Sequence, residues 1–209
     1  MGLLTLLFSD PLAFLLLVPV LLYSVIAHEI AHGWVAYFFG DKTAKYAGRF
    51  SLNPAVHLDP IGTLTIFLVG FGWAKPVPVD YASLRSRRAI ISVSLAGCLA
   101  NILIATLAIF LLQFAPIQNS QLLGPILLTA AKINITLGAL NLIPIPPLDG
   151  YRVLAEFLPW NAKYRLMLLE PFGFFIIIIL LWLGILGPLI NFVYNLILGL
   201  IAIVLGLKA

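Results

Sequence analysis

The stretch HEIAH, residues 28–32, places two histidines and a glutamate inside an almost uncharged apolar run. On a helix His28 and His32 lie roughly 40° apart on one face, so they can share a metal ion. Neutral imidazoles suit zinc, and Glu29 can reach a water molecule beside it. Ionisable groups inside a membrane are costly and usually mark a function. The pattern therefore predicts a zinc site with Glu29 as general base; two structural core histidines with Glu29 as counter-ion are the alternative.

A hydrolytic zinc site usually has three protein ligands, so a third is expected among the 8 acidic residues. Asp59 and Asp149 remain once Glu29 and the acidic residues at span ends or in charged loops are set aside. Asp149 closes NLIPIPPLDG, directly after the third predicted span. The prolines of this segment forbid regular helix and leave backbone groups that must face protein or a watery cavity. Such a segment could carry Asp149 back toward the histidines.

Composition predicts an integral membrane protein. Of the 209 residues, 62% are hydrophobic and only 10% are charged, and the mean hydropathy is +1.11. Soluble domains carry roughly a quarter charged residues. The single cysteine excludes a disulfide framework or a cysteine zinc site. We interpret the net charge of +4 as loop topology in a lipid bilayer, and we expect no nucleic acid as a partner.

The apolar stretches predict an all-α polytopic membrane protein with about five transmembrane helices plus a re-entrant or interfacial strand-like element. A span needs about 20 apolar residues. The candidate spans are residues 11–39, 89–112, 122–143, 172–186 and 189–207. Gly187-Pro188 predicts the break between the last two spans. Residues 61–74 are too few for a crossing, and their Gly, Thr and β-branched content predicts the strand-like element.

Basic residues predict the orientation of the chain. They gather in loops 40–60, 75–88 and 145–171, whereas loop 113–121 carries no charge. The positive-inside rule places the three basic loops in the cytoplasm. We therefore expect a multi-pass protein of the cell membrane, with its N-terminus outside, its C-terminus cytoplasmic and its active site near the cytoplasmic side. Residues 61–74 must then dip into the membrane and return.

HEIAH in a first long span, followed by NLIPIPPLDG, resembles the intramembrane zinc metalloproteases of the site-2 protease family, in its compact prokaryotic-type branch. That family is marked by HExxH and by Asn-x-x-Pro-x-Pro-x-Leu-Asp-Gly. The fixed positions of the second motif are matched by Asn141, Pro144, Pro146, Leu148, Asp149 and Gly150. SLAGCLAN, residues 94–101, resembles a third family stretch, Ala-Gly-Pro-x-x-Asn, with Cys98 in place of proline. The resemblance covers roughly residues 23–154, and we expect no PDZ domain.

The resemblance implies one zinc ion per chain, held by His28, His32 and Asp149, with Glu29 as the catalytic base. It makes Asn141 a candidate to hold the substrate or stabilise the oxyanion. Asn101 is a second candidate, although a structural bond between helices serves as well. The implied activity is hydrolysis of a peptide bond within or near a transmembrane segment of a membrane-protein substrate. A regulatory membrane partner is not identified by the sequence.

We expect a single intramembrane metalloprotease domain over residues 1–209, with a catalytic core at about 11–154 and C-terminal spans at about 172–207. The strand-like element could pair with an unwound substrate, with Phe71 and Lys75 as contact candidates. A plug that seals the site, with Lys75 reaching toward water, is the alternative. His57 could be a fourth ligand or contact Asp59, although a structural role is the more usual one for such a histidine.

Two other functions use the same residues. A zinc or proton-coupled transporter would show repeated halves and polar groups at several depths, whereas the carboxylates here collect beside HEIAH. A non-catalytic relative that binds transmembrane helices would be expected to lose the base or a ligand. Glu29, His28, His32 and Asp149 are all present. A protease is therefore the preferred interpretation.

Overall fold

Helices dominate the computed structural model, which describes residues 3–69 and 72–207, and no β-strand occurs within this part of the chain. Its elements in chain order are α1 (Leu3–Ser9), α2 (Pro11–Phe38), α3 (Thr43–Tyr46), η1 (Pro54–Val56), α4 (Pro60–Val69), α5 (Arg87–Leu111), α6 (Ala115–Gln118), α7 (Leu123–Asn141), α8 (Asp149–Ala155), α9 (Trp160–Met167), η2 (Glu170–Phe172), α10 (Gly173–Trp182) and α11 (Leu186–Val204).

Five helical stretches of the described chain are long and apolar enough to cross a membrane, which confirms the predicted polytopic all-α fold. They are Pro11–Phe38, Arg87–Leu111, Leu123–Asn141, Trp160–Trp182 and Leu186–Val204. The fourth stretch begins earlier than predicted because it includes α9 and η2. The 10 residues of α10 measure only about 15 Å, half of a bilayer core, so α10 needs these preceding turns to span it.

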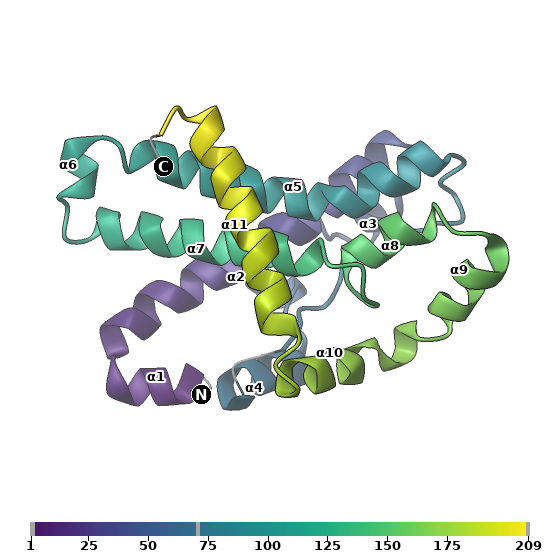
Figure 1. Ribbon diagram of the computed structural model, residues 1–209, viewed down its shortest axis with the longest axis horizontal. Helices are drawn as coiled ribbons and strands as arrows, with labels where there is room; N and C mark the ends of the chain where they lie inside the picture. Colours follow the sequence, from purple (N-terminus) through teal and green to yellow (C-terminus); the bar gives the residue numbers. More distant parts are fainter. Residues whose placement is uncertain (1–2, 70–71, 208–209) are drawn as a thin grey trace.

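The three helices α2, α5 and α7 form the centre of the molecule, and α11 lies across α7 at a steep angle (Figure 1). The contact between α5, α7 and α11 is built from Ala105, Ala139, Ile135, Ile197 and Ile201. Small side chains matter here because helices in lipid associate mainly through close van der Waals packing. Large apolar side chains such as Leu103 and Leu107 are exposed on the outer surface of α5, as a lipid environment allows.

The described part of residues 61–74 does not form the predicted strand-like element. The chain is helical over Pro60–Val69, and residues 72–80 follow as irregular chain. With no second strand to pair with, an apolar segment can satisfy its backbone groups only as a helix. Asp59 begins that helix, because its Oδ1 accepts a hydrogen bond of 2.7 Å from the N–H of Gly62. At 10 residues, or about 15 Å, α4 is too short to cross a bilayer.

The last two spans are separate helices, as predicted, but the break between them lies at residues 183–185, a few residues before the predicted Gly187-Pro188, which is part of α11. Helix α10 ends at Trp182 and α11 begins at Leu186. Gly184 makes the turn with a φ of 73°, a left-handed conformation that favours glycine. Pro188 lies in the first turn of α11, where backbone N–H groups have no partner within the helix and a proline is tolerated.

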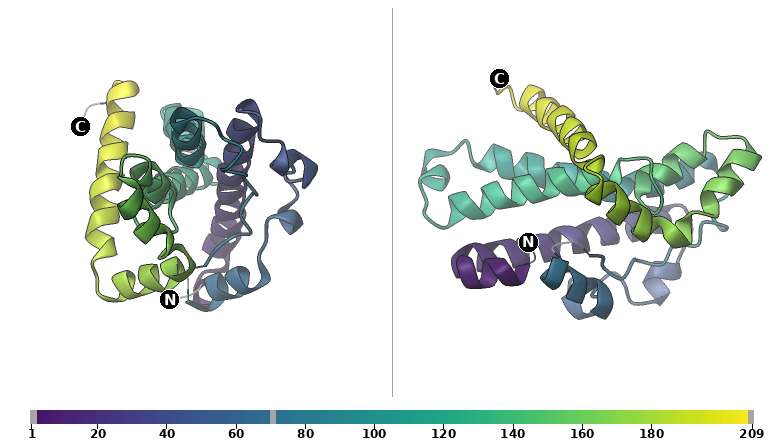
Figure 2. Two further views of the ribbon diagram at one scale, coloured as in Figure 1. Left: turned by 90° about the vertical axis from the view of Figure 1, so that its right-hand side faces the viewer. Right: turned by 60° about the horizontal axis from the view of Figure 1, so that its bottom comes forward.

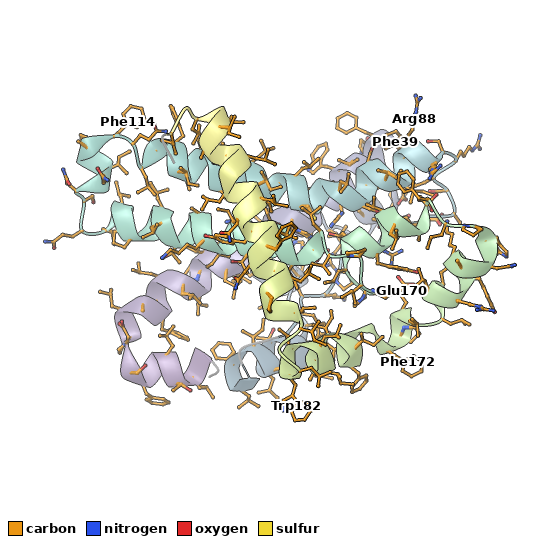
Figure 3. The ribbon with its side chains drawn as sticks, viewed as in Figure 1. Phe39, Arg88, Phe114, Glu170, Phe172 and Trp182 are labelled. Carbon is orange, nitrogen blue, oxygen red and sulfur yellow. The ribbon has the colours of Figure 1, made fainter. Side chains whose placement is uncertain are left out.

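The two ends of the molecule differ in character. Helices α3, α8 and α9 lie at one end of the long axis and α6 lies at the other (Figure 1). Figure 3 places Arg88 and Glu170 at the first end and Phe114 at the second. Helices α1 and α4 lie side by side along one flank in both Figure 1 and the right-hand view of Figure 2. The loops that carry the basic residues therefore share one end of the protein.

Candidate metal centre

Three side chains from α2 and α8 converge on one point. The Nε2 atoms of His28 and His32 lie 3.0 Å apart. The Oδ2 atom of Asp149 lies 3.1 Å from the first and 3.2 Å from the second. Both histidines are buried. In the part of the chain that the structure describes, this is the one group of three His, Cys, Asp or Glu side chains close enough to hold a metal ion.

The donor atoms fit zinc. With bonds of about 2.0–2.1 Å, the ligand atoms of a tetrahedral zinc site lie roughly 3.3 Å apart. The observed separations of 3.0, 3.1 and 3.2 Å are close to that value. The Nδ1 of His32 donates to the backbone oxygen of Val93 at 2.7 Å, which leaves the lone pair of Nε2 facing Asp149. Lone pairs and a carboxylate that face one another repel unless they share a cation.

Asp149 reaches the histidines because the chain turns back sharply after α7. Helix α7 ends at Asn141, and Asp149 is the first residue of α8. The proline-rich link between them is not helical, as its sequence predicted. Gly150 permits the close return, since a Cβ there would lie 2.8 Å from the backbone oxygen of Ile143. The Asp-Gly pair therefore contributes both a candidate metal ligand, Asp149, and the space that Gly150 leaves for the returning chain.

Helix α5 closes the centre from the other side with two residues whose roles the sequence analysis missed. A Cβ at Gly97 would lie 2.5 Å from Nε2 of His32, so only glycine leaves room for the imidazoles. The neighbouring thiol of Cys98 points at Oδ2 of Asp149 across 3.9 Å. Both residues belong to SLAGCLAN, which was the available signal. That stretch therefore shapes the metal site, because Gly97 leaves room for the imidazoles and Cys98 contacts Asp149.

Glu29 lies beside the ligands and is held by a segment that we call the strap, residues 72–80. Its Oε2 accepts a hydrogen bond of 2.7 Å from the backbone N–H of Val77. Val77 is buried, with an exposed fraction of 6%. The contact fixes one carboxylate oxygen of Glu29 and leaves the side chain on the wall of a cavity described below.

The strap is fixed at both ends by buried side chains and loop backbone. The N–H of Lys75 donates to the backbone oxygen of His57 at 2.8 Å, and Nη2 of Arg49 donates to the oxygen of Lys75 at 2.5 Å. At the far end, the N–H of Asp80 donates to Oδ2 of Asp41 at 2.8 Å. Loop 40–60 thus positions the strap that positions Glu29.

A cavity of about 910 Å³ opens beside the metal-binding group. Most of its lining is apolar, and it is walled by α2, the strap, α7, α8 and α10. Arg152 and Glu170 line it too, joined by an ion pair of 2.5 Å between Nη2 and Oε1. The polar side chains that reach this cavity from the catalytic motifs are His28, Glu29, His32, Asn141 and Asp149.

The two candidate asparagines occupy different places. Asn141 lines the cavity, and its Nδ2 donates to the backbone oxygen of Leu137 at 3.0 Å. Asn101 is fully buried at 0% exposure and is not part of the cavity wall. Its Oδ1 lies 2.6 Å from Nδ1 of His28 instead. The geometry of Asn101 favours a bond between helices over contact with a substrate.

The remaining candidates lie away from the ligands or cannot be placed. The side chain of Lys75 is exposed and is absent from the cavity wall, and Phe71 lies outside the described residues. Nε2 of His57 is hydrogen-bonded with the backbone oxygen of Ser51 at 2.7 Å, which agrees with a structural role. Asp59 serves as the cap of α4 and does not join the metal-binding group.

The fold and site define a polytopic helical membrane protein with a His-His-Asp metal group beside a glutamate. Comparison with known proteins agrees. The model of Peptidase family M50 matches residues 115–183, which include Asp149. The protein named "Putative zinc metalloprotease YwhC" from Bacillus subtilis is 38% identical over 172 residues, 78% of each chain. Rip2 of Mycolicibacterium smegmatis, named in the same way, is 30% identical over 80% of this chain and 67% of its own.

A more distant relative is the zinc metalloprotease MJ0392 of Methanocaldococcus jannaschii, 31% identical over 69% of this chain but only 34% of its own length. No solved structure matches the chain. The chain belongs to Peptidase family M50, the site-2 protease family of zinc metalloproteases. The family, the enzyme class and the zinc cofactor expected from the sequence are thereby confirmed.

Proposed function

We propose that this enzyme hydrolyses a peptide bond within or near a transmembrane segment of a membrane protein. In this proposal Glu29 is the general base, and His28, His32 and Asp149 hold the zinc ion. One observation carries the proposal. These four side chains open together on a largely apolar cavity of about 910 Å³ among helices of membrane-spanning length.

Zinc supplies Lewis acidity that makes water nucleophilic near neutral pH and polarises the scissile carbonyl. Side chains and backbone groups of the chain move the protons and position the reacting groups. The backbone N–H of Val77 occupies Oε2 of Glu29, so we assign proton transfer to Oε1. Oε1 takes a proton from the attacking water and returns it to the leaving amine nitrogen. We propose that Asn141, which lines the cavity, donates its second Nδ2 hydrogen to the backbone of the substrate.

A transmembrane helix satisfies its own backbone hydrogen bonds, so the substrate must unwind locally before its carbonyl can be attacked. The freed chain needs hydrogen-bond partners. Irregular backbone beside the cavity is supplied by the strap, whose prolines favour extended conformations, in place of the strand predicted for residues 61–74. Pro76 and Pro78 have no N–H, so this part of the strap would bind mainly through its carbonyl oxygens. Pairing along an exposed strand edge is a common mode of peptide recognition.

The placement in the membrane follows from charge. The basic loops lie together at the end of the molecule that holds α3, α8 and α9 (Figure 1), and we assign that end to the cytoplasm. His28 and His32 lie about 9–15 Å along α2 from Phe38 at this end. We place the protein in the cell membrane, in contact with lipid, as one catalytic domain over residues 1–209. The site then opens toward the cytoplasm.

Cleavage of a single-span test substrate by the purified protein in detergent tests the proposal, with zinc per chain measured in the same samples. Glu29→Gln should retain one zinc ion and lose at least a hundredfold in rate, since general base catalysis typically contributes about 10²–10⁴-fold. Asp149→Asn should lose both zinc and activity.

Glu156→Gln makes the same chemical change outside the cavity and should cut at the wild-type rate. Glu156 forms an ion pair with Lys163 and is not part of the cavity wall. Full activity in Glu29→Gln would overturn the assigned base. Zinc that remains bound in Asp149→Asn with unchanged affinity would overturn the assigned ligand set.

A further inference from the structure

A chain of buried hydrogen bonds runs from the back of His28 across α5 to α7. Oδ1 of Asn101 lies 2.6 Å from Nδ1 of His28. Nδ2 of Asn101 donates to Oδ1 of Asn134 at 2.7 Å, and Nδ2 of Asn134 donates to Oγ of Ser24 at 2.8 Å. Asn101 and Asn134 are both 0% exposed. Three membrane-spanning helices thus meet in one polar network behind a metal ligand.

Two backbone carbonyls fix the direction of this network. Nδ2 of Asn134 also donates to the oxygen of Ala130 at 2.8 Å, and Nδ2 of Asn101 also donates to the oxygen of Ser24 at 3.3 Å. A carbonyl oxygen can only accept. Turning either amide over would place its Oδ1 against a carbonyl oxygen in a buried site, where an unpaired acceptor is costly.

The orientation of Asn101 determines the state of His28. Because Oδ1 of Asn101 faces the imidazole, Nδ1 of His28 must carry the hydrogen and donate it. Nε2 then presents its lone pair toward Asp149. In metal sites the partner of the second ring nitrogen commonly sets both tautomer and ring orientation. His32 reaches the same state without the network, since its Nδ1 donates directly to Val93.

We propose that Asn134 is a positioning residue for the metal centre. Acting through Asn101, it holds His28 in the Nδ1–H tautomer and presents Nε2 to zinc. Nothing in the sequence motifs singles out Asn134, which lies 15 positions before Asp149 by numbering and does not line the cavity. The inference rests on the zinc assignment of the proposed function, but it does not depend on which substrate is cut.

The test uses the full-length protein in detergent with ¹⁵N-labelled histidine, stripped of metal, at a pH where the rings are neutral. Ring nitrogen shifts report which nitrogen is protonated. The chain has only 3 histidines. His57 should appear as the Nε2–H tautomer because that atom faces the oxygen of Ser51. His28 and His32 should both appear as Nδ1–H.

Asn134→Leu and Asn134→Ala remove the oxygen that accepts from Nδ2 of Asn101 at 2.7 Å and leave only the longer contact of 3.3 Å to the backbone oxygen of Ser24. We expect a mixed tautomer for His28, unchanged spectra for His32 and His57, and a loss of roughly tenfold or more in zinc affinity by chelator competition. Asn134→Asp, with its buried carboxyl protonated, keeps an oxygen that accepts from Asn101 and an O–H that donates to the oxygen of Ala130, so it should retain the tautomer. Ser24→Ala should leave it unchanged, because Oδ1 of Asn134 still accepts from Asn101 and both carbonyl anchors remain.

An unchanged His28 tautomer in Asn134→Leu and Asn134→Ala, with zinc affinity within about twofold of wild type, would overturn the inference. So would an equal change at His32, which would indicate a general loss of packing. A wild-type protein that binds no zinc would instead overturn the proposed function, while the tautomer spectra would still report on Asn134.

Discussion

Glu29 and Val77 lie 48 residues apart in sequence and are joined by a hydrogen bond of 2.7 Å between Oε2 and a backbone N–H. The bond ties a membrane-spanning helix to an irregular strap. It aligns the carboxylate beside the metal-binding group without using a second side chain. If Glu29 is the base, as we propose, its position should not depend on which side chain residue 77 carries, but it should depend on the backbone N–H of that residue.

Val77→Pro removes that N–H while keeping an extended backbone, because residue 77 already lies between Pro76 and Pro78. A hydrogen bond to a charged group contributes about 1.5–3 kcal/mol, so we expect roughly a ten- to hundredfold fall in cleavage rate. Zinc content should not change. The rate is measured with the single-span test substrate.

Val79→Pro is the matched control, since it adds a proline to the same strap and spares the bond to Glu29. It should retain most of the activity. Equal losses in both variants would show that the strap tolerates no further proline, and an unchanged rate in Val77→Pro would exclude an orienting role for its N–H.

Gly97→Ala should disrupt the metal centre. The added Cβ would lie 2.5 Å from Nε2 of His32, far inside van der Waals contact. We expect at least a tenfold loss of zinc affinity, comparable to the loss of a metal-site support, together with loss of cleavage. Zinc affinity is measured by chelator competition and folding by circular dichroism in the same detergent.

Gly138→Ala provides the comparison, because it is the same change in a buried helix. Its Cβ would meet no atom closer than 3.5 Å, an ordinary contact. It should bind zinc like the wild type. Wild-type zinc affinity in Gly97→Ala would mean that α5 can move away from the imidazoles.

The stability of loop 40–60, which holds the strap, depends on pH through the carboxyl of Asp41. Burial alone would raise the pKa of its carboxyl, but hydrogen bonds from the hydroxyl and N–H of Thr43 and the N–H of Asp80 lower it below the usual range. The carboxyl therefore has a lower pKa in the folded protein than in the unfolded chain, where it is about 3.9. Its charge stabilises the folded protein fully at pH values above about 3.9. The stabilisation is lost as pH falls through the folded pKa.

Asp41→Asn should therefore lower the free energy of unfolding by about 1–3 kcal/mol near neutral pH. The difference in unfolding free energy between variant and wild type should narrow below about pH 4. Thermal unfolding in detergent at a series of pH values measures it. A gap that is constant from pH 7 to pH 3 would mean that the charge of Asp41 contributes nothing.

The metal-binding group could be predicted because its spacing is local. His28 and His32 need only a helix to lie on one face, and the prolines before Asp149 predict that the chain leaves the helix and turns back. The partners of these residues could not be predicted in the same way. Val77 meets Glu29, and Asn134 meets Asn101, only because of how distant segments pack. No periodicity in the sequence carries that information.

The strand prediction for residues 61–74 failed for a related reason. Glycine, threonine and β-branched residues favour a strand only where another strand is available to pair with. The described chain has no strand, so Pro60–Val69 satisfies its backbone as a helix. Irregular structure follows in the strap, where prolines and contacts with Arg49, His57 and Asp41 hold the backbone instead.

The return of the chain after α7 has a consequence for biosynthesis. A ribosome delivers α2 and α5 first, and with them both imidazoles, the proposed base Glu29 and the glycine that makes room for the site, Gly97. Two neutral nitrogen donors alone fall short of the three protein ligands of a catalytic zinc site. The anionic third ligand arrives only once α7 has inserted and α8 has folded back. With Asp149 as the proposed third ligand, a partly made chain lacks a complete zinc site, and the enzyme is expected to become active only after its third span is in place.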